Sequence, residues 1–219
     1  MTDSRNSSAS SRRTIKQLAS LGLVAIAYFA LTIFVLHFLR PEQDALRRPT
    51  SDYAVGPYGW LMTSAFLGMA LACLSLAAGL YRGVSEPARS RIGLALIGGV
   101  WVVGLLIAAA FPIDLEGASR TTSGTIHQIN GPIGFLSLTI GVLLISLGFR
   151  HDEKWSALHR PTLVLALAML ALSIVNGASI RLGFGYPGLG QRILLAIFVT
   201  WFVLTAVHLR RRRETPGKA

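Results

Sequence analysis

The chain has 219 residues, of which 52% are hydrophobic and only 14% are charged. Soluble globular domains carry about 25% charged residues, so this composition excludes an ordinary soluble domain and indicates that much of the surface faces lipid. The net charge of +11 does not indicate a nucleic-acid-binding protein, because the basic residues sit at the ends of apolar segments, where they can meet anionic lipid head groups.

Residues 1–16 are polar, rich in Ser and without hydrophobic periodicity, so we expect a disordered N-terminal tail in the cytoplasm. The first apolar run follows at once. It is too long for the apolar core of a signal peptide and has no convincing small-residue cleavage site after it, so we expect a retained span. Residues 211–219 form a basic C-terminal tail, which is also expected in the cytoplasm.

Between the tails, residues 17–210 are predicted to form one membrane domain. A helix needs about 20 residues to cross the hydrocarbon layer, and six apolar runs approach this length. The runs lack the alternating pattern of membrane strands, and a helix satisfies its backbone hydrogen bonds within one segment. The predicted fold is therefore all-α and polytopic, with six transmembrane helices in a compact bundle. The expected spans are residues 18–39, 58–81, 92–111, 126–149, 162–180 and 193–209.

The basic residues also predict the orientation in the membrane. With six spans, both termini lie on one side, and that side holds 15 of the 21 Lys and Arg residues, whereas the other side holds six. Short loops rich in Lys and Arg stay in the cytoplasm. We therefore expect a multi-pass protein of the cytoplasmic membrane with both termini inside, and with the loop between the third and fourth spans outside.

The fourth span carries a stripe of glycines. Gly134, Gly141 and Gly148 recur every seven residues, so they share one helix face. Small residues let helix backbones approach closely in lipid, which predicts that this face packs against neighbouring helices. His127 lies seven residues before Gly134, so its side chain should also point at protein. Gly104, off this stripe, is expected to be less closely packed.

The main candidates for chemistry lie between the third and fourth spans. Asp114 follows the third span and His127 opens the fourth. The loop that joins them is short, so we expect His127 to contact Asp114, directly or through one water. Arg181 or Arg192 is expected in the same cluster, while Glu116 should stay solvated.

Other polar groups gather near the same surface. Asn130 lies three residues after His127 on one helix face, and Asn176 needs a partner within the fifth span. The candidate binding residues are Asp52, Tyr53, Asn130, Asn176, Arg181 and Arg192. Two interpretations stay open. These groups, with Asp114 and His127, either cap helix ends and tie the loops down, or line an outward-facing pocket for a small molecule or lipid head group.

Other kinds of site have less support. Cys73 is the single cysteine, which excludes a disulfide framework, and no histidine pair has the spacing of a zinc site. Histidines near the span ends would permit a haem between facing helices, but their position suits interfacial anchoring better. We therefore expect no metal, no cofactor and no nucleic acid. Membrane lipids are the expected partners, and the sequence indicates no partner protein.

Several motifs together resemble a known family. They are a Ser-x-Tyr element (Ser51, Tyr53), GPYGWLM before the second span, AAAFPID at the end of the third, and a histidine opening the fourth. This pattern is similar to the bacterial and archaeal membrane family catalogued as "domain of unknown function 998", over about Leu18 to Arg210. The resemblance implies a six-helix membrane bundle and assigns no reaction. The residues that it places in the family signature are Phe111, Pro112, Asp114 and His127.

The sequence thus favours a binding or accessory membrane protein with an outward-facing polar site. An alternative is a membrane enzyme acting on a lipid-like substrate, with Asp114 and His127 as an acid–base pair. A proton-coupled small-molecule carrier has less support, because the middle of the spans lacks the broken helices and polar groups typical of carriers. A cavity that reaches His127 from the lipid side would favour the enzyme, and one that reaches mid-membrane would favour the carrier.

Overall fold

We describe the protein from a computed structural model, which covers residues 2–84, 88–183 and 185–211. Every element in these ranges is helical. The elements are α1 (Thr2–Leu39), η1 (Thr50–Ala54), α2 (Gly59–Gly83), α3 (Ala88–Ala95), η2 (Leu96–Trp101), α4 (Val102–Ala110), α5 (Thr122–Gly148), η3 (Phe149–His151), α6 (Ser156–Arg181) and α7 (Pro187–Arg211).

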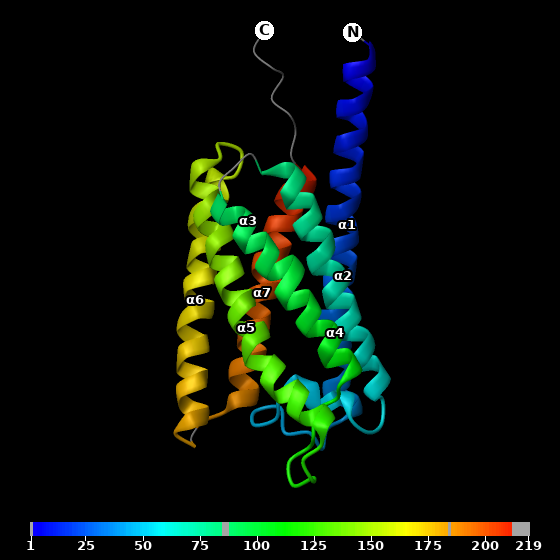
Figure 1. The fold of residues 1–219 in the computed structure, drawn as a ribbon, viewed down its shortest axis with the longest axis vertical. Coiled ribbons are helices and arrows are strands. Elements are labelled where there is room, and N and C mark those ends of the chain that lie inside the picture. The colour runs from blue at the N-terminus through cyan, green and yellow to red at the C-terminus, as the bar shows by residue number, and fades with distance from the viewer. Residues whose placement is uncertain (1, 85–87, 184, 212–219) are drawn as a thin grey trace.

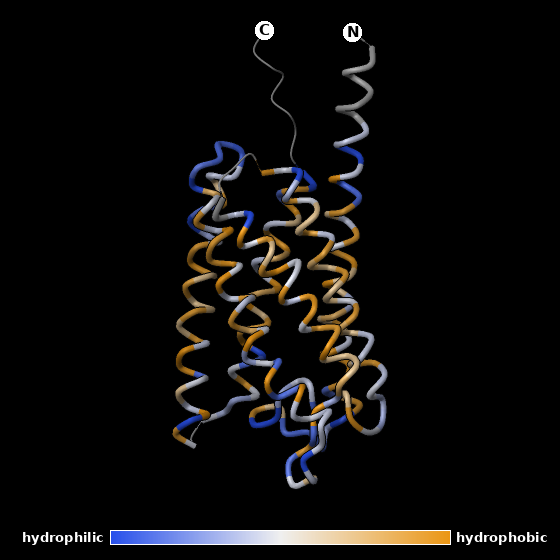
Figure 2. The backbone as a smooth tube through the Cα atoms, in the orientation of Figure 1, coloured by the Kyte–Doolittle hydropathy of each residue, from blue (hydrophilic) through white to orange (hydrophobic). Residues whose placement is uncertain are grey.

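Six helical segments are long and apolar enough to cross a membrane, and α3, η2 and α4 together make one of them. Their middle parts are hydrophobic, and hydrophilic residues gather at both ends of the bundle (Figure 2). The predicted all-α fold with six transmembrane helices is confirmed.

The helices run along one long axis (Figure 1), and their contacts follow one another around a closed ring. α1 packs on α2, α2 on α4, α3 and α4 on α5, α5 on α6, α6 on α7, and α7 returns to α1. The start of α1 and the end of α7 lie at the same end of the bundle, which we call the terminal end. The opposite end, called the distal end, carries the longer connections at residues 40–58 and 111–121.

Helix α1 is longer than its apolar run. It begins at Thr2, so residues 2–16, for which the composition predicts disorder, continue the helix beyond the rest of the bundle. This segment contains neither proline nor glycine, the residues that most disfavour a helix. Of the expected C-terminal tail, residues 212–219 lie outside the described part of the chain.

The glycine stripe of α5 packs inward, as its spacing predicts. A Cβ on Gly141 would lie 2.6 Å from Ile97 and 3.1 Å from the Gly93 carbonyl, so the two helix backbones approach closely there. A Cβ on Gly134 would meet the Trp101 ring at 3.0 Å. At Gly104, off this stripe, a Cβ would meet the Asn130 side chain at 3.2 Å, which is a looser contact than at Gly141 or Gly134.

The terminal half of the bundle is filled by aromatic side chains. Phe149 and Trp155 stack with their ring centroids 4.5 Å apart, and Trp155 donates its indole N–H to the Gly83 carbonyl at 3.2 Å. Trp201 donates to Ser146 Oγ at 3.0 Å and is fully buried. Large buried rings with satisfied N–H groups make a rigid core, so this half of the ring is closed.

The third span contains a π-helical turn at residues Leu96–Trp101. A π turn adds one residue to a helical turn and so changes which side chains face the neighbours after it. Trp101 ends this turn. It is 5% exposed, and its ring lies 5.2 Å from the Phe135 ring of α5, near the middle of the bundle.

Candidate functional site

A cavity of about 590 Å³ lies inside the distal half of the ring. Every membrane-crossing segment and η1 contribute to its wall. Most of its wall is apolar and includes Phe29, Met69, Trp101, Leu105 and Phe135. Sites for small molecules typically have volumes of about 300–1,000 Å³ and mostly apolar walls with a few polar groups, and this cavity has both properties.

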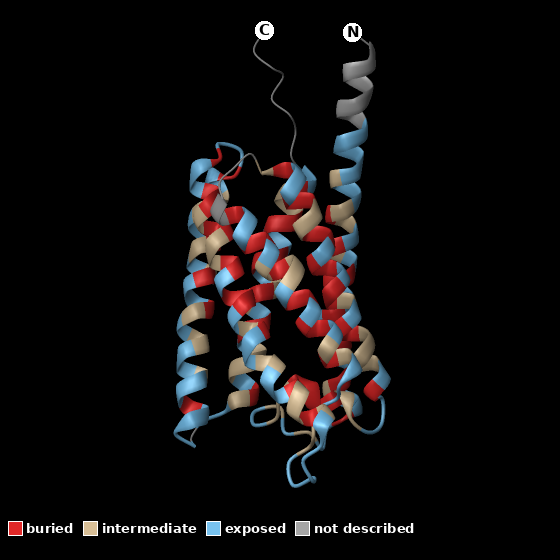
Figure 3. Cartoon of the chain, viewed as in Figure 1, coloured by how far each residue is buried: buried red, intermediate tan, exposed pale blue. Residues whose placement is uncertain are grey.

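The cavity opens between α5 and α6. Leu136 of α5 and Ile180 of α6 both line it, yet each is 57% exposed, so they stand at its mouth. Gly131 and Gly177 also line it, and a Cβ built on either would have no other atom within 4 Å. Figure 3 shows the distal half of α6 mostly exposed or partly buried. This mouth faces sideways, toward the hydrocarbon layer of a membrane.

The mouth ends near the middle of the bundle. There Thr139 of α5 and Ser173 of α6 are joined by a hydrogen bond of 3.3 Å between their hydroxyl groups. From that point to the terminal end, α5 and α6 stay together, and His159 of α6 contacts the Ser146 carbonyl of α5 at 2.9 Å. The opening is therefore confined to the distal half.

His127 lines the cavity at its distal end and is 7% exposed. Its Nδ1 lies 2.8 Å from the carbonyl oxygen of Phe111, at the end of α4. A carbonyl oxygen only accepts hydrogen bonds, so Nδ1 carries the hydrogen. In the neutral ring Nε2 then holds a lone pair, and the described residues offer it no hydrogen-bond donor.

Asn130 lies one turn deeper on the same helix. Its amide nitrogen donates to the Gly104 carbonyl at 2.9 Å, which fixes the orientation of the side-chain amide. The amide oxygen is therefore left as an acceptor at the cavity wall. His127 and Asn130, three residues apart, share the face of α5 that their spacing predicts.

Two further amides line the cavity from the other side of the ring. Gln191 of α7 accepts hydrogen bonds at Oε1 from the backbone N–H of Thr50, at 2.7 Å, and from its hydroxyl group, at 3.2 Å. Asn176 of α6 packs directly on Gly190 of α7, where a Cβ would overlap its side chain. Thus the polar groups of the cavity also hold η1, α6 and α7 together.

Below the cavity, the connection between α1 and α2 folds into a cap made of residues 40–58. Arg192 of α7 fastens this cap by donating to the Arg48 carbonyl at 2.6 Å and to the Tyr53 hydroxyl at 3.4 Å. It also donates to His37 Nε2 of α1 at 2.9 Å. From the other side, Arg40 donates to the carbonyls of Val55 and Pro57, each at 2.8 Å.

Asp52 is buried within this cap and is 3% exposed. The nearest cation is Arg48, whose guanidinium lies 3.7 Å from its carboxylate. Burial raises the pKa of Asp52 to about 6, against the opposing effects of Arg48 and Arg192. Arg48 also pairs with Glu116 at 3.0 Å, so Glu116 is exposed, as expected, but is tied to the cap.

The expected direct contact between Asp114 and His127 is wrong, because each side chain has another partner. Asp114 accepts hydrogen bonds from the Thr121 backbone N–H at 2.8 Å and from its hydroxyl at 2.7 Å. Thr121 in turn caps α5 by accepting from the Gly124 N–H at 3.0 Å. These bonds lower the pKa of Asp114. Hydrogen bonds from Thr121 to this carboxylate hold the capping residue in place and so stabilise the start of α5. His127 instead donates a hydrogen bond to the Phe111 carbonyl.

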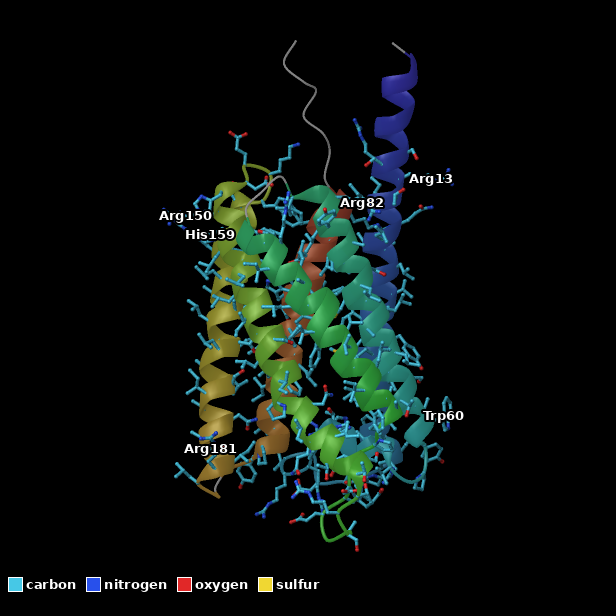
Figure 4. All side chains as sticks on the ribbon, viewed as in Figure 1. Arg13, Trp60, Arg82, Arg150, His159 and Arg181 are labelled. Atoms are coloured by element: carbon cyan, nitrogen blue, oxygen red, sulfur yellow. The ribbon has the colours of Figure 1, made fainter. Side chains whose placement is uncertain are left out.

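The predicted residues thus fall into three groups. Asp52, Tyr53 and Arg192 meet in the cap, whereas Asn130, Asn176 and His127 line the cavity. Asp114 lies on the exposed loop with Thr121. Arg181 lies at the distal end of α6 (Figure 4), and Arg192 bonds to His37 and to the cap. No hydrogen bond among the described residues joins either arginine to His127, so the expected cluster is not formed.

Sequence reasoning missed Gln191 and Thr50 as wall residues. Gln191 directly follows the sequence GYPGLG near the start of α7. A glutamine at the start of a membrane helix is a polar group that needs a partner, and this was the signal that could have indicated it. Its partner Thr50 is 141 residues away, and no local pattern indicates that pairing. Across the described residues, no group of three or more His, Cys, Asp or Glu side chains could hold a metal ion.

A family model described as "Protein of unknown function (DUF998)" matches residues 23–208 of the chain. This range includes all six membrane-crossing segments, in whole or in large part. No curated protein and no solved structure matches the chain.

Proposed function

Because the chain belongs to the DUF998 family, which has no assigned activity, we propose a function from its cavity: it binds an uncharged amphipathic small molecule in the outer half of the cytoplasmic membrane. The observation that carries this proposal is the sideways mouth between Leu136 and Ile180. A mouth of this kind admits molecules dissolved in lipid, whereas a water-soluble ligand would need an opening toward solvent. Both termini lie in the cytoplasm in this proposal.

The chemistry of the wall supports an uncharged ligand. Among the described residues that line the cavity there is no Asp, Glu, Lys or Arg. A charged group buried in an apolar wall without an opposite charge is strongly disfavoured. The wall instead offers a histidine, four side-chain amides and short hydroxyl side chains near the distal end, with apolar side chains toward the middle. A head group at the distal end and a chain toward the membrane centre match this gradient.

The alternatives have less support. The enzyme alternative relied on an Asp114–His127 pair, and each of these residues has a different partner, although the cavity does reach His127 from the lipid side. The carrier alternative needs a route through the terminal half, which is filled by Phe149, Trp155 and Trp201. The cavity reaches about the middle of the bundle at Trp101 but stops at this aromatic core.

The test is to identify what co-purifies with the protein. Protein extracted in a mild detergent would be analysed by native mass spectrometry and by analysis of its organic extract. Ala108→Phe should fill the cavity, because Ala108 lines it. Leu106→Phe on the same helix is the matched control, because Leu106 is 46% exposed and lies outside the wall.

We expect an amphipathic molecule bound to the native protein and to Leu106→Phe, and its loss from Ala108→Phe. The proposal fails if the native protein carries no such molecule, or if Ala108→Phe retains the same amount. Thermal unfolding of all three proteins would establish that loss of the ligand does not follow from misfolding.

A further inference from the structure

We propose that the ligand of the cavity is a membrane alcohol, a lipid whose uncharged head group ends in a hydroxyl, and that it enters sideways between α5 and α6. This inference rests on the proposed function and adds the chemistry of the head group and the route. Two observations carry it: the hydrogen-bonding state of His127 and Asn130, and the position of the mouth.

The wall presents two acceptors side by side on α5. His127 has its hydrogen on Nδ1, held by the Phe111 carbonyl, so Nε2 accepts. Asn130 has its amide nitrogen held by the Gly104 carbonyl, so its oxygen accepts. In neutral His127 the single donor is held by the Phe111 carbonyl, so this ring can only accept from the ligand, and the Asn130 oxygen beside it also accepts. This arrangement selects a ligand group that donates.

A hydroxyl is the uncharged lipid head group that donates a hydrogen bond and needs little space. An ether, ester or ketone oxygen only accepts, so it can pair with neither His127 Nε2 nor the Asn130 oxygen in this buried wall, whereas a hydroxyl pairs with one of them. Leaving buried polar groups unpaired disfavours such ligands more than a missing apolar contact would. An ammonium group would donate but carries a charge, and the described wall has no acid to balance it.

The position of the mouth matches the way a lipid alcohol lies in a membrane. His127 is near the start of α5, at the level of the head groups, whereas Trp101 and Phe135 are near the membrane centre. Along this same depth the mouth is open beside Gly131 and Gly177, and it is closed toward the terminal end by the bond between Thr139 and Ser173. A chain can therefore enter lengthwise without leaving the hydrocarbon layer.

The first experiment compares two probes on the purified full chain in lipid nanodiscs. One is a long-chain primary alcohol with a photoreactive group in its chain, and the other is the methyl ether of the same molecule. We expect the native protein to be labelled half-maximally at an alcohol concentration about three- to tenfold below that of the ether, the difference expected for one hydrogen bond. Labelled peptides should come from the cavity wall.

The matched variants are His127→Phe and His159→Phe. His159 also holds its Nδ1 at a backbone carbonyl, that of Ser146 at 2.9 Å, but it lies in the terminal half (Figure 4). We expect His127→Phe to bring the alcohol to the level of the ether and His159→Phe to keep the preference. A preference that persists in His127→Phe would overturn the assignment of Nε2 as the acceptor.

The labelling of the native protein also distinguishes failure of the hydroxyl inference from failure of the proposed function. Equal binding of alcohol and ether would overturn the hydroxyl inference and leave the proposed function standing. Labelling by neither probe, with an ester or ketone bound instead, would overturn the hydroxyl inference as well. No saturable labelling by any uncharged amphipath would overturn the proposed function itself.

The second experiment tests the route. Gly177→Leu places a side chain in the open space at the mouth, where a Cβ meets no other atom. Gly99→Leu is the control, because Gly99 also has open space beside it but does not line the cavity. We expect Gly177→Leu to slow labelling by alcohol and ether alike, about tenfold, while Gly99→Leu leaves the rate unchanged. An unchanged rate in Gly177→Leu would exclude entry between α5 and α6.

Discussion

Arg192 of α7 donates its Nε–H to Nε2 of His37 on α1, across 2.9 Å. His37 in turn places Nδ1 2.6 Å from the Ile33 carbonyl, so Nδ1 carries the hydrogen and Nε2 is free to accept. The first and last spans are thereby joined at the distal end. Because Arg192 also holds the Arg48 carbonyl, the same side chain closes the ring and fastens the cap below the cavity.

Removing this guanidinium should loosen the distal end. We expect Arg192→Ala to lower the free energy of unfolding by about 2–4 kcal/mol, because several partly buried acceptors lose a charged donor together. Thermal unfolding in detergent, followed by size exclusion, would measure the change. Arg181→Ala is the control, since Arg181 is an exposed arginine at the same end of the bundle, and it should unfold like the native protein. A native melting temperature for Arg192→Ala would show that the cap is held by other contacts.

The sequence predicted the membrane helices well because their signal is local and strong. The expected second span, residues 58–81, corresponds to Gly59–Gly83, and the expected fourth, residues 126–149, lies within the span Thr122–His151. Hydrophobicity over about 20 residues is enough to define such a helix, whatever it packs against. The glycine spacing on α5 likewise predicted its inward face, because helical periodicity alone sets which residues share a face.

The contacts at the distal end could not be predicted in the same way. Asp114 and His127 are near each other along the chain, and charge alone suggested a pair. In the structure, however, the Thr121 backbone and hydroxyl satisfy Asp114 within the loop, and Phe111 satisfies His127. Backbone groups at helix ends compete for the same side chains, and sequence spacing does not reveal which partner is selected. The cavity itself depends on side chains from all six spans.

The close packing of α5 on α3 and η2 leads to a second prediction. Gly141→Ala places a methyl group 2.6 Å from Ile97, so the helices must move apart. We expect a loss of about 1–3 kcal/mol of stability, as in other overpacked cores. Gly99→Ala is the matched control, because a Cβ there meets no atom within 4 Å, and its stability should be unchanged or slightly higher. Equal melting temperatures for the two variants would contradict the packing of the stripe.

Burial of Asp52 makes the cap sensitive to pH. Its pKa is raised from 3.8 to about 6 in the folded protein, so the folded state holds the proton more tightly than the unfolded state. The resulting stabilisation is fully present below pH about 4 and is lost as the pH rises through about 6. Its upper limit is about 3 kcal/mol, from about two pKa units.

The direction of this pH dependence can be measured by comparing the melting temperatures of the native protein and of Asp52→Asn. Asp52→Asn cannot titrate, so the fall in melting temperature of the native protein between pH 4.5 and pH 7.5, beyond that of Asp52→Asn, reports Asp52 alone. We expect the native protein to lose more stability over this interval. Parallel curves would mean that Arg48 and Arg192 keep the carboxylate ionised throughout.

Substitutions at Asp114 should affect stability, whereas substitutions at His127 should affect ligand binding. Thr121→Val removes the hydroxyl that links Asp114 to the Gly124 N–H, and we expect it to cost about 1 kcal/mol, as for other helix caps. Asp114→Asn should lower the melting temperature in the same direction and leave ligand binding unchanged. His127→Phe should change the ligand preference. Loss of binding in Asp114→Asn, with native stability, would return Asp114 to the site.

The orientation in the membrane decides which leaflet the cavity faces, and it leads to the last prediction. Six crossings put the two ends of the chain on one side, and Arg13, Arg82 and Arg150 lie toward that terminal end while Arg181 lies at the distal end (Figure 4). Basic residues in short loops favour the cytoplasm, so the distal end should face outward. Ser119 and Glu153 are exposed positions on the distal and terminal loops, respectively.

Single cysteines at these two positions would test the orientation in intact cells. The native Cys73 is fully buried, so it should not react with a membrane-impermeant thiol reagent and can stay in place. We expect Ser119→Cys to be labelled in intact cells and Glu153→Cys only after the cells are opened. Because the hydrogen-bonding groups of the cavity lie at the distal end, the reverse pattern would move the ligand to the cytoplasmic leaflet while leaving the geometry of the site unchanged. The choice of lipid alcohols to screen would then follow the composition of that leaflet.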